Sequence, residues 1–342
     1  MFKRRTLFIL GAGASHEARL PCGDQLALRI SSKLDIEFNG YDISGPGDGE
    51  LFSRFARTRQ REINQFFQAA RLIRDGIHLS NSIDDSIDDF LDLHRDNPNL
   101  ILLAKATIAK CIIEAERDSL LSFDDSNADN TINFTNLHAT WFAKFMKMLG
   151  KNVPRDQAAS IFENVSFIVF NYDRCLEHFL HHAVRRLYGF TYQEAASICD
   201  EVQIEHPYGL VAPLRIESGS GTRFGQTDRN WIELASNIKT YTEQVLDGDM
   251  LESIRAQVER AECIVFLGCA FHEPNMLMLR PAETLKPVPV FSTGYGISDD
   301  DAETVVGAIG SIFKGSERGM VRFRNKLTCA GLFDNFSRTI IR

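Results

Sequence analysis

A run of strand-forming residues that leads directly into a glycine pair constrains the fold of this chain most strongly. Thr6 to Leu10 (TLFIL) do not alternate in polarity, and Gly11-Ala12-Gly13-Ala14-Ser15 follows them. A continuous apolar run predicts a strand buried on both faces, as in a parallel sheet covered by helices. Glycines directly after such a strand allow a tight turn and close approach to a bulky group such as a pyrophosphate. The sequence therefore predicts an α/β fold with a candidate phosphate loop.

The same glycines also fit a strand-to-helix turn that binds nothing, because a lone GxG motif is a weak signal. His16 occupies the place of the third glycine in the dehydrogenase fingerprint. No clear ribose-binding acid follows a second adjacent strand. We therefore expect no ordinary dehydrogenase, and both interpretations of the loop stay open at this point.

Further strands are predicted along the chain, and a long helical region separates the first strand from the others. Between about residues 50 and 150 the apolar positions recur at three- and four-residue steps without a strand signal. We expect an α/β fold with a Rossmann-like parallel sheet and a large helical insertion at about 50–150, in one domain covering residues 1–342. The further predicted strands are Val165–Phe170, Val202–Glu205, Cys263–Leu267 and Val288–Phe291.

Several local expectations follow from turn and helix signals. The glycine-rich stretch Glu37–Gly49 predicts a loop, and Ile132–Leu149 predicts one helix. Pro289 suggests that the strand around it lies near a sheet edge. After a helix at 299–313 we expect an irregular tail. The acidic run Asp84-Asp85 and Asp88-Asp89 is typical of a solvated helix face rather than of a cation site.

Charge and cysteine content limit the class of protein. The formal net charge of −8 argues against a general nucleic-acid binder, so we expect no direct sequence-specific nucleic-acid binding. No apolar run approaches the ~18 residues of a membrane span. Seven cysteines occur without a CxxC pair, which favours reduced thiols in the cytoplasm over a zinc ribbon or a disulfide framework. We see no convincing metal-ligand set.

Four polar or glycine-containing clusters follow predicted parallel strands. In open α/β sheets the ligand crevice lies outside the carboxyl ends of the strands, so these clusters predict one shared ligand site. Taken singly, each cluster has a simpler explanation: Asn171 as a turn residue, Asp173 as a helix cap, His206 as a loop histidine and Gly268 as a turn glycine. The clusters are Gly11–Ser15, Asn171–Asp173, His206–Gly209 and Gly268–Phe271.

The order of these motifs resembles the sirtuin family, and more closely the sirtuin-like NADase domains of bacterial anti-phage defence systems. The resemblance rests on LFILGAGAS, LPCGDQL, FNYDRCLE, HPYG and IVFLGCAFHEPNM, with SIDDFLDL inside the helical insert. It spans about residues 5 to 280 and matches the insert only loosely. It implies an enzyme that uses NAD+ as its substrate.

The resemblance implies a role for each matching residue. Asn171 would order the nicotinamide ribose and a water, and His206 would act as a general base. Asp173 would help to hold the nicotinamide side of the pocket, with helix capping as a competing role. The NAD phosphates and nearby ribose would contact Gly11, Ala12, Gly13 and Ser15; the adenosine half would contact Gly268 and Cys269, assisted by Asn275.

Departures from the deacylating sirtuins favour NAD+ hydrolysis. These enzymes carry a four-cysteine zinc module that helps to grip an acetyl-lysine peptide, and this chain has no CxxC pair. Leu20-Pro21-Cys22-Gly23 replaces their usual proline-aspartate-phenylalanine-arginine run, and Gly268-Cys269-Ala270 replaces a hydroxyl-rich motif. Breaking the nicotinamide–ribose bond needs no metal, only a positioned ribose and one directed nucleophile. With an unperturbed pKa near ~6.5, His206 is expected to be largely neutral and able to accept a proton.

The leading hypothesis is therefore an NAD+ glycohydrolase that gives nicotinamide and ADP-ribose and acts as a regulated effector of anti-phage defence by abortive infection. The resemblance suggests a homo-oligomer and a separate protein partner, such as a HerA-type hexameric ATPase that contacts the helical insert. Two other hypotheses stay open: a protein deacylase or ADP-ribosyltransferase, and a non-catalytic module that binds NAD or ADP-ribose.

Overall fold

Six parallel strands form the central sheet within the part of the chain that the structure describes. In the computed structural model the described residues are 1–39, 42–80, 87–124, 130–214, 221–227, 230–245, 247–281, 287–313 and 320–342. Numbered one to six along the chain, the strands lie in the order 3-2-1-4-5-6, which is that of a doubly wound dinucleotide-binding sheet. This confirms the predicted Rossmann-like α/β fold. Across the sheet the strands are β5 (Gln203–Glu205), β4 (Val165–Val169), β1 (Thr6–Leu10), β6 (Cys263–Leu267), β7 (Val290–Thr293) and β8 (Val321–Arg324).

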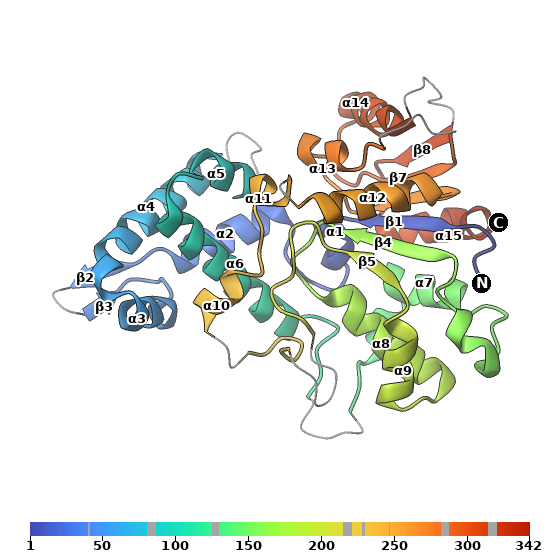
Figure 1. Cartoon of the computed structure of the whole chain (residues 1–342), viewed down its shortest axis with the longest axis horizontal. Helices are drawn as coiled ribbons and strands as arrows, with labels where there is room; N and C mark the ends of the chain where they lie inside the picture. The colour runs from blue at the N-terminus through green and yellow to red at the C-terminus, as the bar shows by residue number, and fades with distance from the viewer. Residues whose placement is uncertain are drawn as a thin grey trace.

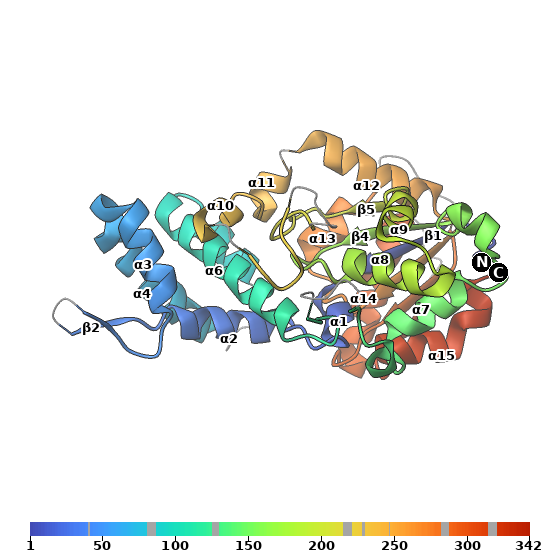
Figure 2. The same cartoon turned by 90° about the horizontal axis from the view of Figure 1, so that it is seen from below.

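Helices cover both faces of the sheet, which explains the unbroken apolar runs of its central strands. Leu7 and Ile9 of β1 point to a core shared with α12 (Gly248–Arg260) and α14 (Asp299–Gly310). Phe8 and Leu10 point to the opposite core. That second core includes α7 (Trp141–Leu149), α8 (Cys175–Tyr188) and α15 (Cys329–Ile340). Figure 2 shows α12 on one side of the sheet and α7 and α15 on the other.

A separate helical core extends from one end of the sheet (Figure 1). Its central helix, α6, begins where Asn97 accepts a hydrogen bond from the Leu100 amide and Pro98 occupies the first turn. This core confirms the predicted large helical insertion. Its helices are α2 (Gly23–Lys33), α3 (Gly49–Thr58), α4 (Ile63–Ser80), α5 (Ile87–Leu93), α6 (Pro98–Arg117) and α10 (Trp231–Ala235).

The two cores do not divide at one point of the sequence. α7 lies within residues 50–150 but packs against the sheet, whereas α2 and α10 lie outside that range and pack with the insert. The division into one domain, 1–342, with an insertion at about 50–150 remains our proposal. Further helical segments are α1 (Ala12–His16), α9 (Tyr192–Cys199), α11 (Tyr241–Val245), α13 (Glu273–Met278) and the 3-10 turns Gln60–Glu62, Phe134–Leu137, Arg155–Ser160 and Ser311–Phe313.

Two local predictions in the first half of the chain were wrong. The predicted loop at 37–49 contains an antiparallel pair, β2 (Glu37–Asn39) and β3 (Asp42–Ser44), whose polar strands gave no apolar signal. The predicted helix from Ile132 is instead a 3-10 turn followed by α7. The break comes at Thr140, whose extended backbone precedes the first residue of α7.

The region after β6 is more regular than predicted. β7 lies next to the edge strand β8, so the prediction of a strand near a sheet edge is confirmed. Pro289 precedes β7 and so leaves its ladder donors intact. The tail predicted to be irregular forms β8 and α15, whose Phe333 and Ile340 are buried. The tail also contacts the N-terminal segment, since the Lys3 amide donates a hydrogen bond to the Ile341 carbonyl (Figure 1).

None of the helices within the described ranges combines the length and the apolar character that a membrane crossing requires.

Candidate functional site

The four predicted clusters lie at the carboxyl ends of four neighbouring strands. β5, β4, β1 and β6 are adjacent in the sheet; one residue separates β4 from its cluster, and the other three strands end directly before theirs. The strand reversal of the doubly wound order falls between β1 and β6, and ligands of such sheets bind at this point. The fold thus brings the predicted residues to a single edge of the sheet.

Three glycines hold the loops after β1 and β6 together. The Gly13 amide donates to the Gly268 carbonyl at 3.0 Å. A Cβ on Gly11 would lie 2.4 Å from the Gly268 oxygen, and one on Gly268 would lie 2.1 Å from the Ala14 nitrogen. Gly268 also has a φ of +61°, which favours glycine. Packing between the two loops therefore requires these glycines, which agrees with the interpretation of Gly268 as a turn glycine. Ala12 is the first residue of α1.

Ser15, Asn171 and Asp173 form a buried hydrogen-bond network. The Ser15 hydroxyl donates to Asp173 Oδ1 at 3.0 Å, and the same oxygen accepts from the amide of Cys175, the first residue of α8. Asp173 therefore holds the first amide of α8, although Arg174 occupies the N-cap position. Asn171 Nδ2 donates to the Gly11 carbonyl at 3.0 Å and lies 3.3 Å from the Ser15 hydroxyl oxygen. Burial raises the pKa of Asp173 above its ordinary value, although its hydrogen bonds oppose the shift.

The carboxamide oxygen of Asn171 is the unusual atom of this network. Asn171 is 6% exposed, and among the described residues its Oδ1 is buried without a hydrogen-bond partner. A buried acceptor left unpaired costs about 1–3 kcal/mol, so such atoms are rare unless they serve a ligand or a water. The free acceptor suits a hydroxyl donor at the carboxyl edge of the sheet.

His206 follows β5 and pairs with a residue that the sequence reasoning missed. Its Nε2 lies 2.5 Å from Glu177 Oε1, and its Nδ1 lies 3.4 Å from the Asn171 carbonyl. Glu177 is in the first turn of α8. The helix predicted after the Asn171–Asp173 cluster begins at the sheet edge, and an acidic residue in its first turn is the signal that could have identified Glu177.

The Glu177 contact changes the expected protonation of His206. Burial alone would lower the pKa of His206, but the charge and hydrogen bond of Glu177 outweigh it and raise the pKa above the ordinary value. Burial would likewise raise the pKa of Glu177, yet the neighbouring His206 lowers it. Both ring nitrogens face acceptors, which favours the doubly protonated ring. The raised pKa means that His206 holds its proton to a higher pH than the ordinary pKa used for the sequence-based expectation implied.

Two tyrosine contacts border the site on the side of the helical core. The Tyr208 hydroxyl donates to Asn275 Oδ1 at 2.5 Å, which joins the loop after β5 to α13. The Tyr172 hydroxyl donates to Asp88 of α5, whose pKa burial raises to about 6. Asp88 is thus not on a solvated face as predicted, because it turns toward the sheet. Asp84 and Asp85 lie outside the described residues.

Cys269 directs its thiol toward the backbone of the sheet. Its sulfur lies 3.5 Å from the Ile9 carbonyl and 3.7 Å from the Leu267 carbonyl, and burial raises the pKa of the thiol to about 12. A thiol in this setting supplies no thiolate. In the described part of the chain, no group of three or more His, Cys, Asp or Glu side chains is arranged to hold a metal ion.

Comparison with known proteins shows low similarity to a solved structure. No protein-family model matches the chain, and no curated protein matches it. Among solved structures, the chain is similar to a mutant Sir2 homologue in complex with 2′-O-acetyl ADP ribose, with 11% identity and a TM-score of 0.40. The match covers 98% of this chain and 91% of that chain. The fold assignment rests on the strand order described above and not on this likeness.

Proposed function

We propose that the chain is an NAD+ glycohydrolase that cleaves the nicotinamide–ribose bond to give nicotinamide and ADP-ribose. The observation that carries the proposal is the pairing of Asn171 and His206 at the carboxyl ends of β4 and β5, with the Asn171 acceptor unpaired. A binding site for an apolar ligand would need neither a buried amide acceptor nor a histidine–carboxylate pair.

Asn171 acts by orientation in this proposal, because its amide does not titrate. Its Nδ2 is held by the Gly11 carbonyl, which fixes the carboxamide plane and leaves Oδ1 to accept from a ribose hydroxyl or a water. Bond cleavage develops positive charge on the ribose while a neutral nicotinamide leaves. A fixed acceptor that positions the sugar and the water supplies the entropic part of catalysis.

His206 acts as the general base, and Glu177 positions it. In the described conformation both ring nitrogens face acceptors, so a ring protonated at both must release the Nδ1 proton to solvent before Nδ1 can take a proton from the attacking water. The Asn171 carbonyl contact, at 3.4 Å, is the weaker of the two. We propose that Nδ1 breaks its contact with the Asn171 carbonyl and turns to the substrate, while Nε2 keeps its hydrogen bond to Glu177. A base placed in this way raises the reaction rate by about 10²–10⁴-fold.

The remaining site residues surround the proposed NAD+ position. Gly11, Ala12, Gly13 and Ser15 lie beside the phosphates and the nearby ribose in this proposal, and Asp173 lies on the nicotinamide side. The adenosine half lies against Gly268, Cys269 and Asn275. Because the Cys269 thiol points into the sheet, its contact with NAD+ is assigned to the backbone.

We propose that the protein acts in the cytoplasm as a regulated effector of anti-phage defence that depletes NAD+. The proposal extends to a homo-oligomer and a protein partner of the HerA-type ATPase class that docks on the helical core. Its support is the motif resemblance, together with the burial of His206, which is 9% exposed and paired with Glu177. A resting site of this kind suits an enzyme that stays inactive until triggered.

A second candidate function is non-catalytic binding of NAD or ADP-ribose. The same two hydrogen bonds of His206 favour it, because a binding module needs a fixed histidine and not a mobile base. Product analysis separates the two functions.

The test is NAD+ consumption with product analysis, for the protein alone and with its genomic neighbour. Wild type, His206→Ala and the control His138→Ala are compared, since His138 is an exposed histidine away from the sheet edge. We expect nicotinamide and ADP-ribose from wild type and from the control, and none from His206→Ala. Intact but bound NAD+ supports the binding module, and consumption only with a protein acceptor supports a deacylase or transferase.

A further inference from the structure

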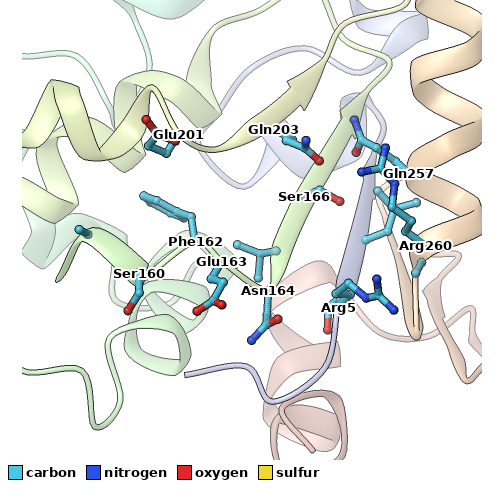
Figure 3. A pocket seen from close by; sticks show the side chains of 15 residues that line it. Arg5, Ser160, Phe162, Glu163, Asn164, Ser166, Glu201, Gln203, Gln257 and Arg260 are labelled. Carbon is cyan, nitrogen blue, oxygen red and sulfur yellow. The ribbon is translucent and has the colours of Figure 1, made fainter. Parts of the chain in front are cut away.

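A pocket of about 480 Å³ lies at the amino-terminal edge of the sheet, opposite the site described above (Figure 3). Its walls come from the first residues of β1 and β4, from β5 and from the last turns of α12. Its volume is within the range of small-molecule sites. The proposed NAD+ hydrolysis uses only the carboxyl edge, so this pocket has no part in it.

The floor of the pocket is partly polar, whereas the covered face of a sheet is normally apolar. Leu7, Ser166 and Gln203 lie side by side in register on β1, β4 and β5, and all three line the pocket. One step along the strands, the same face carries Ile9 and Ile168, which are fully buried. In this row Leu7 still belongs to the apolar core under α12, whereas Ser166 and Gln203 beside it bring a hydroxyl and an amide to the pocket.

Gln257 of α12 gives the pocket a buried amide with unmet hydrogen bonds. The residue is 5% exposed, and neither Nε2 nor Oε1 has a partner among the described residues. Figure 3 shows its side chain turned from α12 toward the strands. A buried carboxamide with donor and acceptor both unpaired is unfavourable in the empty protein. A ligand edge with an adjacent acceptor and donor would satisfy both atoms.

Charged side chains are separated around the pocket. Figure 3 shows Arg260 on the α12 side with Gln257, and Glu163 and Glu201 on the far side. Arg5 also lines the pocket, and its pair with Glu262 is 3.7 Å long and exposed. Such a pair is weak and gives way to a closer anion. The pocket thus combines a carboxamide with two guanidinium groups.

We propose that this pocket binds an adenine mononucleotide. The adenine N6 and N7 atoms match the acceptor and donor of the Gln257 carboxamide, the pairing that glutamine makes with adenine. The phosphate lies at Arg5 and Arg260, because guanidinium groups recognise phosphate oxygens. Glu163 and Glu201 accept from the ribose hydroxyls. Guanine offers two acceptors along the same edge, so the site disfavours it.

The test is calorimetric titration of the full chain with AMP, with GMP and with inorganic phosphate. We expect AMP to bind wild type, and GMP and phosphate alone to bind more weakly. Gln257→Met keeps the side-chain volume, removes the amide and is expected to weaken AMP binding by about tenfold or more. The matched control is Gln193→Met at an exposed position of α9, which leaves binding unchanged.

Two further variants keep the result interpretable. Arg260→Ala alters an exposed side chain and is expected to weaken AMP binding without changing the melting temperature. Asn171→Ala, at the other edge of the sheet, is expected to leave AMP binding intact. The proposal is overturned if wild type does not bind AMP, if Gln257→Met and Arg260→Ala bind it as wild type does, or if Asn171→Ala abolishes binding. These results are independent of NAD+ hydrolysis.

Discussion

The buried ion pair between Glu116 and Arg174 connects the helical core to the site and gives the sharpest stability prediction. Both side chains are 0% exposed. Glu116 Oε1 accepts from the Arg174 amide and Nε at 3.1 and 3.0 Å, and Oε2 accepts from the Gly225 amide at 3.0 Å. Arg174 directly follows Asp173, so the pair also fixes the backbone that carries the site carboxylate.

We expect Glu116→Ala to lower the free energy of unfolding by about 3–5 kcal/mol, because it leaves a buried guanidinium without its counter-charge. Adding Arg174→Met removes that charge and is expected to recover part of the loss. Recovery is incomplete because the carbonyl and hydroxyl of Thr222 then lose their donor, at about 1–3 kcal/mol. The double variant is therefore less destabilised than Glu116→Ala alone.

Urea unfolding followed by tryptophan fluorescence measures these differences. The control is Arg117→Met, one residue further along α6, whose side chain is 60% exposed and pairs with Asp118. We expect a change below about 1 kcal/mol there. If Glu116→Ala costs no more than this control, or if the double variant loses the sum of the single losses, the assignment of a buried coupled pair is refuted.

Three further predictions follow from local contacts. Gly268→Ala is expected to lower the free energy of unfolding by about 2–6 kcal/mol, because Gly268 has a φ of +61° and backbone atoms occupy the place of a Cβ. Gly307→Ala, at a helical position with open space, is expected to raise it by about 0.5–1 kcal/mol. Equal melting temperatures of the two variants would contradict this. Asp88→Asn is expected to raise the free energy of unfolding by about 1–2 kcal/mol at pH 7 and by less at pH 4. The reason is the raised pKa of Asp88, about 6, because a buried carboxyl with such a pKa favours folding at low pH and opposes it as pH rises. Equal increases at both pH values in urea unfolding would argue against this. Glu177→Gln is expected to lower the pKa of His206 in an NMR titration, because it removes the carboxylate charge that raises this pKa. The stability that the pair contributes is present below about pH 6.5 and is lost as pH rises through the raised pKa of His206. An unchanged titration of His206 would contradict the role of Glu177.

The central strands and the position of the clusters were predictable from sequence because both depend on local signals. Unbroken apolar runs mark β1, β4 and β6, and a parallel sheet brings the ends of its strands to one edge. β8 (VRFR) was missed because it alternates charged and apolar residues outside β7. The C-terminal helix α15 was missed as well, although Thr328 begins it with a side-chain cap.

Contacts between distant segments set the remaining features, and no local pattern reveals them. The need for glycine at position 268 follows from the loop after β1, more than 250 residues earlier in the chain. The charge state of His206 follows from Glu177 on a different element. Asp88 resembles a solvated acid in sequence, and only the fold shows that it meets Tyr172.

The central claim is that Asn171 and His206 form a catalytic pair for NAD+. The most direct measurement is nicotinamide release from NAD+ by wild type, by Asn171→Ala and by the control Asn136→Ala, which alters an exposed asparagine. NAD+ affinity is measured on the same samples, with the genomic neighbour present. The account predicts release by wild type and the control, and loss of release in Asn171→Ala with the fold retained. Equal release by wild type and Asn171→Ala, or NAD+ binding without release by any of the three, would contradict it.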